Sequence, residues 1–175
     1  MKTCAPDDVT RSSSRREAHD GLLCRTAGIL EEPLPSGERL RRVCEILQTA
    51  GLSYDWVGYY LVSRDEERVL ELGPFAGEPT VHVRIGFGQG ICGLAADRET
   101  TIVIGDVSAE DNYLSCSPSV RSEVVVPVYW EGELVGELDI DSHMVDGFDD
   151  ADREFLEAVA DLTSADVAMS GGFRS

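Results

Sequence analysis

The chain has 175 residues, of which 42% are hydrophobic, so it is long enough for one domain with a real core and too short for two ordinary ones. Its formal net charge of −18, with Lys2 as the only lysine, argues against binding to nucleic acid, which needs clustered Lys and Arg. It contains neither an apolar run of about 18 residues nor a basic segment followed by an apolar one at the N-terminus, so we expect a cytoplasmic protein.

The acid-rich, lysine-poor composition has two interpretations: a high-salt cytoplasm, or a GC-rich genome with a solubilising surface. The cysteines are Cys4, Cys24, Cys44, Cys92 and Cys116. Their odd number and the lack of a C-x-x-C pair argue against a disulfide scaffold or a zinc knuckle. We therefore expect no metal site, and expect a functional cysteine to act by redox or nucleophilic chemistry.

The first half of the chain begins with a polar, unperiodic stretch. Residues 1–20 are expected to form a flexible arm, and residues 21–175 the folded domain. A helix is predicted to start near Ser36, as its N-cap, and to end at Gly51. Its apolar stripe has helical spacing and consists of Leu40, Val43, Cys44 and Leu47.

Short β-rich segments follow this helix. W-V-G-Y-Y-L-V (56–62) and R-V-L-E-L (68–72) predict a hairpin, and V-H-V-R-I (81–85) alternates as a strand does. The glycine-rich G-F-G-Q-G (86–90) then leads into a short helix, and T-I-V-I (101–104) into another strand. A loop of about 15 residues carries Cys116, and such long loops in compact domains are often functional.

The last third predicts two strands and a helix. The strands are V-V-V-P-V-Y-W and L-V-G-E-L-D-I-D, joined by a turn at Glu131–Gly132. The helix has its cap near Asp149, and its apolar face consists of Phe155, Leu156, Val159 and Leu162. The predicted fold class is α+β, an antiparallel sheet with its long helices on one face.

Three features of the sequence suggest chemistry. Glu137, Asp139 and Asp141 share one face of their strand, since side chains alternate with period 2. They form either a solvated face or a cation pocket in which crowding and burial raise one acid's pKa until it can donate a proton. G-F-G-Q-G lacks the Lys and Ser/Thr of a phosphate loop, so its glycines are expected to allow close backbone approach. Cys116 lies in a polar segment near Arg121, which favours a thiolate.

Five segments in order resemble the motifs of free methionine-(R)-sulfoxide reductase, a single-GAF-domain family. They are W-V-G-Y-Y-L, L-G-P-F-A-G-E-P, V-R-I-G-F-G-Q-G-I-C-G, S-C-S-P-S-V-R-S-E-V-V-V-P and G-E-L-D-I-D-S. The resemblance runs from Trp56 to the last helix. It implies a GAF domain with a ligand pocket on the sheet face opposite the terminal helices. It also implies reduction of the free amino acid, no bound cofactor, a thioredoxin-like dithiol as external reductant, and a homodimer.

The resemblance also assigns roles to residues. Cys116 matches the nucleophile, whose thiolate attacks the sulfoxide sulfur, releases methionine and is left as a sulfenic acid. Glu123 and Asp141 hold and protonate the sulfoxide oxygen, and Asp139 helps to bind the substrate ammonium. The S-methyl group is received by an aromatic wall of Trp56 and Tyr60, which without the resemblance could equally be core residues.

One departure concerns how the sulfenic acid is resolved. The family's usual resolving cysteine lies two residues before the R-I pair, and His82 occupies that position here. The resemblance leaves Cys92 as a disulfide partner for Cys116, but Cys4, Cys24 or an external thiol are alternatives. Glu137 stands where the family usually has an aliphatic residue. The alternative function is a GAF-type small-ligand or redox-sensing module without turnover, because a fold does not dictate one function.

Overall fold

The computed structural model describes residues 6–110, 114 and 118–171, with side chains from residue 14 onward. It contains four α-helices, six strands and one short 3₁₀ helix within these residues. The helices are α1 (Pro6–Leu30), α2 (Ser36–Gln48), α3 (Gly90–Arg98) and α4 (Asp150–Ser170), with the 3₁₀ helix η1 at Val107–Ala109. The strands are β1 (Trp56–Val62), β2 (Val69–Ala76), β3 (Arg84–Gly86), β4 (Ile102–Ile104), β5 (Ser122–Trp130) and β6 (Glu133–Ser142).

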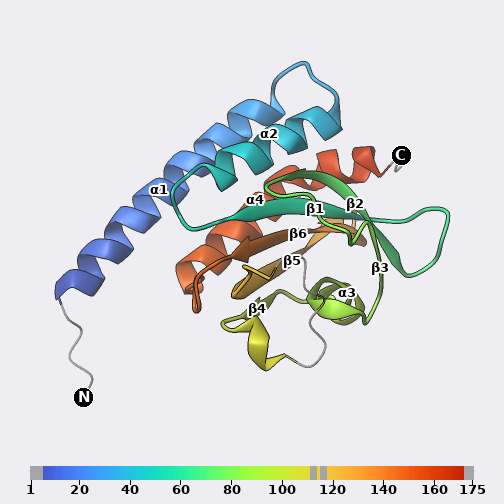
Figure 1. Cartoon of the computed structure of the whole chain (residues 1–175). Helices are drawn as coiled ribbons and strands as arrows, with labels where there is room; N and C mark the ends of the chain where they lie inside the picture. Colours follow the sequence, from blue (N-terminus) through green and yellow to red (C-terminus); the bar gives the residue numbers. More distant parts are fainter. Residues whose placement is uncertain (1–5, 111–113, 115–117, 172–175) are drawn as a thin grey trace.

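The strands form one antiparallel sheet in the order β3-β2-β1-β6-β5-β4. Helices α1, α2 and α4 cover one face of this sheet, and α3 lies on the other (Figure 1). The predicted α+β class and GAF-type arrangement are confirmed. None of the described helices is long and apolar enough to span a membrane.

Two apolar cores lie on opposite faces of the sheet. The larger lies under α1, α2 and α4, and includes Val57 and Tyr59 of β1 and Val124 of β5. The smaller lies under α3, and includes Trp56 and Tyr60 of β1 and Val125 of β5. Neighbouring residues of one strand thus enter different cores, because their side chains alternate between the two faces.

Local sequence rules explain most of the element boundaries. All four residues of the predicted α2 stripe are buried. The predicted N-cap is wrong, because Ser36 is the first helical residue and Pro35 precedes it without a side-chain cap, and the helix ends at Gln48 and not at Gly51. The β5–β6 turn has positive φ at Glu131 and Gly132, as a tight hairpin requires. Helix α4 begins with a reciprocal capping box between Asp149 and Asp152.

Three further expectations were wrong. The segment expected to be a flexible arm is mostly helix α1, whose buried positions include the polar His19 and Thr26 as well as Leu22. Leu162 is 43% exposed, and Thr163 is the buried residue at this point of α4. The strand predicted over 81–85 is present only from Arg84, as β3.

Helix α1 is held by a polar cluster that an apolar pattern could not reveal. Asp152 of α4 accepts hydrogen bonds from Arg15 at 2.8 Å and Tyr54 at 2.6 Å, and contacts His19 at 3.1 Å. The His19 ring also stacks on Phe155 at 4.3 Å. These contacts join α1 to α4 although α1 has few apolar residues to bury.

Candidate active site

The carboxylates predicted to form the site lie on the sheet face covered by α3. In the pairing of β5 with β6, Glu123 lies directly opposite Asp141. In the pairing of β1 with β6, Trp56 lies opposite Asp141, and Gly58 opposite Asp139. Three central strands therefore bring an aromatic ring and three acids to one place, as the predicted period-2 pattern requires.

These acids are buried, so the interpretation of β6 as a solvated acidic face is wrong. Glu137 and Asp139 are 0% exposed, Asp141 1% and Glu123 4%. The reason is topological: β6 lies between β1 and β5 in the middle of the sheet, and not at its edge.

Cys92 approaches the acids from α3, the helix that covers this face of the sheet. It lies in the first turn of α3, 4% exposed, and its Sγ is 3.3 Å from Asp139 Oδ2 and 3.8 Å from Glu123 Oε1. Gly93 lets α3 pack closely on the glycine-rich segment, because a Cβ on Gly93 would lie 2.3 Å from the carbonyl oxygen of Gly86. Within the segment itself, the prediction of close approach holds at Gly90, which has a φ of +63° and where a Cβ would lie 2.9 Å from the Leu114 side chain.

Several carboxyl oxygens in this cluster have no hydrogen-bond donor among the described residues. They are both oxygens of Glu137, both of Asp141, and Oδ1 of Asp139. Buried polar groups in folded proteins are nearly always paired, so an unpaired group in a native structure needs an explanation. A site that is completed by a bound ligand is one such explanation.

Burial governs the protonation of these acids. It is the main cause that raises the pKa of Glu123 well above its ordinary value, and the charges of Asp139, Asp141 and Glu137 raise it further. The pKa of Glu137 is raised by burial and by the charge of Asp139, with the Cys92 thiol acting weakly in the opposite direction, and the pKa of Asp141 is raised by burial, Asp139 and Asp55. Burial raises the pKa of Asp139 to about 7, while the Cys92 thiol opposes the shift. The cluster thus holds protons at pH values where exposed carboxyls are ionised, which a proton donor requires.

Aromatic rings border the acids. Trp56 stacks on Phe75 with ring centroids 5.6 Å apart and lies 6.4 Å from Tyr60. Gly58 makes room for the indole, because a Cβ there would lie 2.2 Å from Trp56 Cη2. Phe75 was missed as a site residue, although its strand partner is Gly58 and it lies in the P-F-A segment.

Trp56 and Tyr60 are placed differently. Trp56 is 6% exposed, and its Nε1 donates to the carbonyl of Glu78 at 3.0 Å. Tyr60 is 0% exposed, and its hydroxyl donates to the carbonyl of His82 at 2.9 Å. Trp56 borders a cavity and Tyr60 supports the ring behind it, so the indole is the better candidate for substrate contact.

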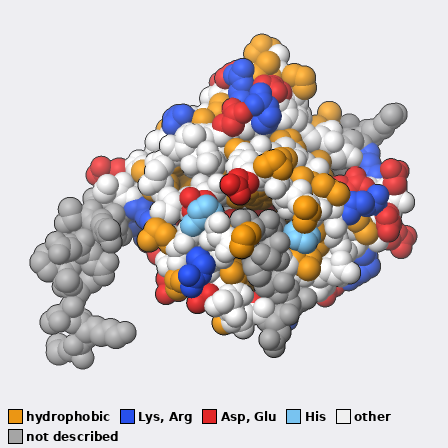
Figure 2. Space-filling model, viewed as in Figure 1, with side chains coloured by type: hydrophobic (Ala, Val, Ile, Leu, Met, Phe, Trp, Pro, Cys, Tyr) orange, Lys and Arg blue, Asp and Glu red, His pale blue; other side chains and the backbone are white. Residues whose placement is uncertain are grey.

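A small cavity of about 80 Å³ opens beside the cluster. Its lining includes Trp56 and Asp141 together with Asp55, Val120 and His143. Figure 2 shows this side of the molecule hollowed near its centre, where acidic and histidine side chains lie among hydrophobic ones. Asp55 and His143 were not predicted as lining residues. His143 donates its backbone N–H to Asp55 Oδ2 at 2.7 Å, a contact between distant segments that no local motif indicates.

Of the four remaining cysteines, two lie on the long-helix side of the sheet and two lie outside the described residues. Cys116, the predicted nucleophile, and Cys4 lie outside the described residues. Cys44 is buried in the core under the long helices, as predicted, with its Sγ 3.6 Å from the carbonyl of Pro74. Cys24 is exposed on α1. Since α1 packs on the face opposite α3, the sheet separates Cys24 from the acid cluster, and the expected flexible approach of Cys24 does not agree with the structure.

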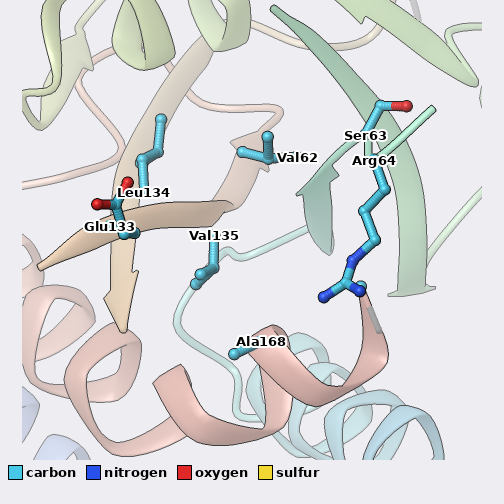
Figure 3. A pocket seen from close by; sticks show the side chains of 8 residues that line it. Val62, Ser63, Arg64, Glu133, Leu134, Val135 and Ala168 are labelled. Atoms are coloured by element: carbon cyan, nitrogen blue, oxygen red, sulfur yellow. The ribbon is translucent and has the colours of Figure 1, made fainter. Parts of the chain in front are cut away.

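Two other cavities are lined, among the described residues, by none of the predicted site residues. One of about 410 Å³ lies between the ends of β1 and α4 and the start of β6. Figure 3 shows Arg64 extending toward the helix that carries Ala168, with Glu133 and Leu134 across the cavity. The other, of about 720 Å³, lies between α1 and the segments around Leu52 and Met144. Neither has a cysteine among its described lining residues, so the acid cluster remains the candidate active site.

The fold and the site agree with comparisons to known proteins. The GAF domain model matches residues 37–167, so the chain belongs to the GAF domain family. It is 34% identical over 158 residues to GAF domain-containing protein A of Dictyostelium discoideum, covering 90% of this chain and 98% of that protein.

Within that class, the chain is a member of the free methionine-R-sulfoxide reductase family, as the sequence motifs predicted. It is 36% identical over 124 residues to free methionine-R-sulfoxide reductase of Escherichia coli, covering 67% of this chain and 73% of the relative. It also resembles the structure of free methionine-R-sulfoxide reductase from Neisseria meningitidis in complex with its substrate, with a TM-score of 0.81 and 32% identity. That match covers 89% of this chain and 92% of the other.

Proposed function

We propose that this protein reduces free L-methionine-(R)-sulfoxide to methionine. One observation carries the proposal: Glu123, Asp139 and Asp141 form a buried acid cluster beside the Trp56 ring, in a chain related to enzymes named for this reaction. An acid cluster next to an aromatic ring suits a zwitterion with a methyl-sulfur end.

In the proposed chemistry, the Cys116 thiolate attacks the sulfoxide sulfur. The attack forms a bond between the two sulfurs, and the sulfoxide oxygen takes up a proton. The resulting hydroxyl then moves to the cysteine sulfur as the sulfur–sulfur bond breaks, so that methionine leaves with that bond's electron pair and Cys116 becomes a sulfenic acid. Glu123 and Asp141 bind the oxygen and supply the proton that it needs as the bond breaks. Their raised pKa values and their positions opposite each other support this role.

The other end of the substrate is bound by charge. Asp139 as a carboxylate would pair with the substrate ammonium, and the indole of Trp56 would receive the S-methyl group, with Tyr60 behind it. Binding a cation in this cluster would relieve the repulsion that raises the acids' pKa values. The unpaired oxygens of Asp139 and Asp141 are available as acceptors for the substrate.

Recycling needs a second thiol. A thiol condenses with the sulfenic acid to form a disulfide and release water, and an external thioredoxin-like dithiol then reduces that disulfide. Cys92 is the internal candidate because it lies beside Glu123 and Asp139. The expected homodimer and cytoplasmic location belong to the same proposal.

The test is an NADPH-linked thioredoxin assay with the free (R)-sulfoxide, the free (S)-sulfoxide and a peptide-bound sulfoxide. We expect turnover with the first substrate alone. Turnover should be lost in Cys116→Ser and kept in Cys24→Ser, whose thiol is exposed on the far face. Equal turnover of the wild type and Cys116→Ser would refute the proposal.

The second candidate is a GAF module that binds a small ligand without turnover. His82 in the position of the usual resolving cysteine favours it, because a chain without that cysteine lacks the family's usual route of recycling. Calorimetry with methionine and with its (R)-sulfoxide separates the two functions. Tight binding without methionine formation would support the sensor.

A further inference from the structure

The thiol and two of the acids in the candidate active site also have the geometry of a metal site. One ligand atom from each of Cys92, Glu123 and Asp139 lies within 4.8 Å of the other two, and all three residues are buried. They come from α3, β5 and β6, so the fold holds them from two sides of the cluster.

Their spacing fits a tetrahedral ion. Zinc binds sulfur at about 2.3 Å and carboxylate oxygen at about 2.0–2.2 Å, so its tetrahedral sulfur and oxygen ligands lie about 3.6 Å apart. The sulfur of Cys92 lies 3.3 Å from Asp139 Oδ2 and 3.8 Å from Glu123 Oε1. The two sulfur–oxygen distances therefore differ from this spacing by only a few tenths of an ångström, and the two carboxylate oxygens lie within 4.8 Å of each other.

An independent observation also calls for a cation here. Asp139 and Glu137 lie on the same face of β6 and are both fully buried. Among the described residues, no hydrogen-bond donor reaches Oδ1 of Asp139 or either carboxyl oxygen of Glu137. Buried charges in proteins are paired or coordinate metals, so a divalent cation that displaces the cluster's protons would compensate its carboxylates and thiolate. The other two described cysteines, the exposed Cys24 and the buried Cys44, do not lie in such a cluster among the described residues.

We propose that Cys92, Glu123 and Asp139 bind a borderline-soft divalent cation, of which Zn²⁺ is the type, with a fourth position left open. One thiolate with two carboxylates is a ligand set that selects zinc or cobalt over magnesium or calcium, which prefer oxygen alone. Binding replaces the proton of the Cys92 thiol and that of any protonated carboxyl, so it releases protons to solvent.

The proposal goes beyond the proposed function, and its test does not depend on it. If the protein is the reductase, bound Zn²⁺ occupies Asp139 and the Cys92 sulfur, and so inhibits reversibly by blocking both ammonium binding and disulfide formation. Metal binding itself is measured without any turnover.

The experiment uses Co²⁺ as a spectroscopic probe, in a full-length variant with Cys4, Cys24 and Cys116 replaced by Ser. Only Cys92 and Cys44 remain, and Cys44 is buried in the opposite core. With a non-thiol reductant present, we expect one equivalent of Co²⁺ to give a thiolate-to-cobalt charge-transfer band, and Zn²⁺ to abolish it. The further change Cys92→Ser should remove the band.

Calorimetry with Zn²⁺ then tests the acids. Asp139→Asn and Glu123→Gln should each weaken binding at least tenfold, while Glu133→Gln, an exposed acid at the start of β6, should change it less than twofold. Circular dichroism checks the fold of each variant. If an acid variant does not fold, the loss of the cobalt band in Cys92→Ser tests the proposal instead. No charge-transfer band, a band that survives Cys92→Ser, or Zn²⁺ affinity unchanged in both folded acid variants would overturn the proposal.

Discussion

Replacement of Glu137 by Met is expected to stabilise the protein. Glu137 is 0% exposed, and neither carboxyl oxygen has a donor among the described residues. A buried polar group without a partner costs about 1–3 kcal/mol even when it is neutral. Met has a similar length and no such group, so the substitution should raise the free energy of unfolding by about 1–3 kcal/mol, or the melting temperature by roughly 2–12 °C.

The pH dependence makes this prediction specific. The pKa of Glu137 is raised in the folded protein, first by burial and then by Asp139. An acid with a raised folded pKa destabilises the fold least while it is protonated, and its cost grows as pH rises from its unfolded pKa of about 4.5 toward its folded pKa. The advantage of the Met variant should therefore grow with pH, by at most about 1.4 kcal/mol per unit.

Urea unfolding at about pH 5 and about pH 8 measures both effects. Glu133→Gln is the control, because this residue lies on the same strand but is exposed, and its stability should change by no more than about 0.5 kcal/mol. A Met variant no more stable than the wild type at pH 8, or an advantage that does not grow with pH, would refute the assignment of an unpaired buried acid.

Three further predictions test other parts of the structure. Asp152→Asn should cost about 3–5 kcal/mol in urea unfolding, against about 0.5 kcal/mol or less for Arg153→Ala in an exposed pair. Burial alone would raise the pKa of Asp152, but its hydrogen bonds to His19, Arg15 and Tyr54 outweigh burial and lower it. The wild type should therefore lose this advantage as pH falls below about 4. An advantage that is constant with pH would contradict the network. Gly58→Ala should displace Trp56, raise KM at least tenfold for the sulfoxide and change the tryptophan fluorescence; an unchanged KM would show that the indole does not contact substrate. Because the pKa of Asp139 is about 7 and ammonium binding needs its carboxylate, KM should rise as pH is lowered from about 8 to about 6; a KM that is flat over this interval would remove Asp139 from that role.

The sequence predicted the elements whose information is local. The α2 stripe, the β1–β2 hairpin and the β5–β6 turn depend on spacing and on glycine, and each was confirmed. The shared face of Glu137 and Asp141 also followed from period 2.

Burial could not be predicted in the same way. An alternating strand of acids has the same pattern at a solvated edge and at the centre of a sheet, and only the strand order places β6 in the middle. Helix α1 was missed for a related reason. Its inner positions include His19, which needs Asp152 of α4 as a partner, and this contact joins residues 133 positions apart.

The site was predicted in part by motif and completed by the fold. The register brings Glu123 opposite Asp141, which the resemblance had assigned to the same sulfoxide oxygen. Helix α3 brings Cys92 to Asp139, a contact that neither the sequence nor the resemblance predicted. Asp55 and Phe75 were not predicted, because their roles arise from contacts with Asp141 and Trp56 across the sheet.

The most direct test of the central claim is a single turnover without external reductant. The reduced protein is mixed with one equivalent of free L-methionine-(R)-sulfoxide, and both the methionine formed and the intact mass of the chain are measured. We predict nearly one methionine per chain, with Cys116 carrying one added oxygen or joined to Cys92 with the loss of two hydrogens. No methionine, or the same yield from Cys116→Ser, would contradict the account.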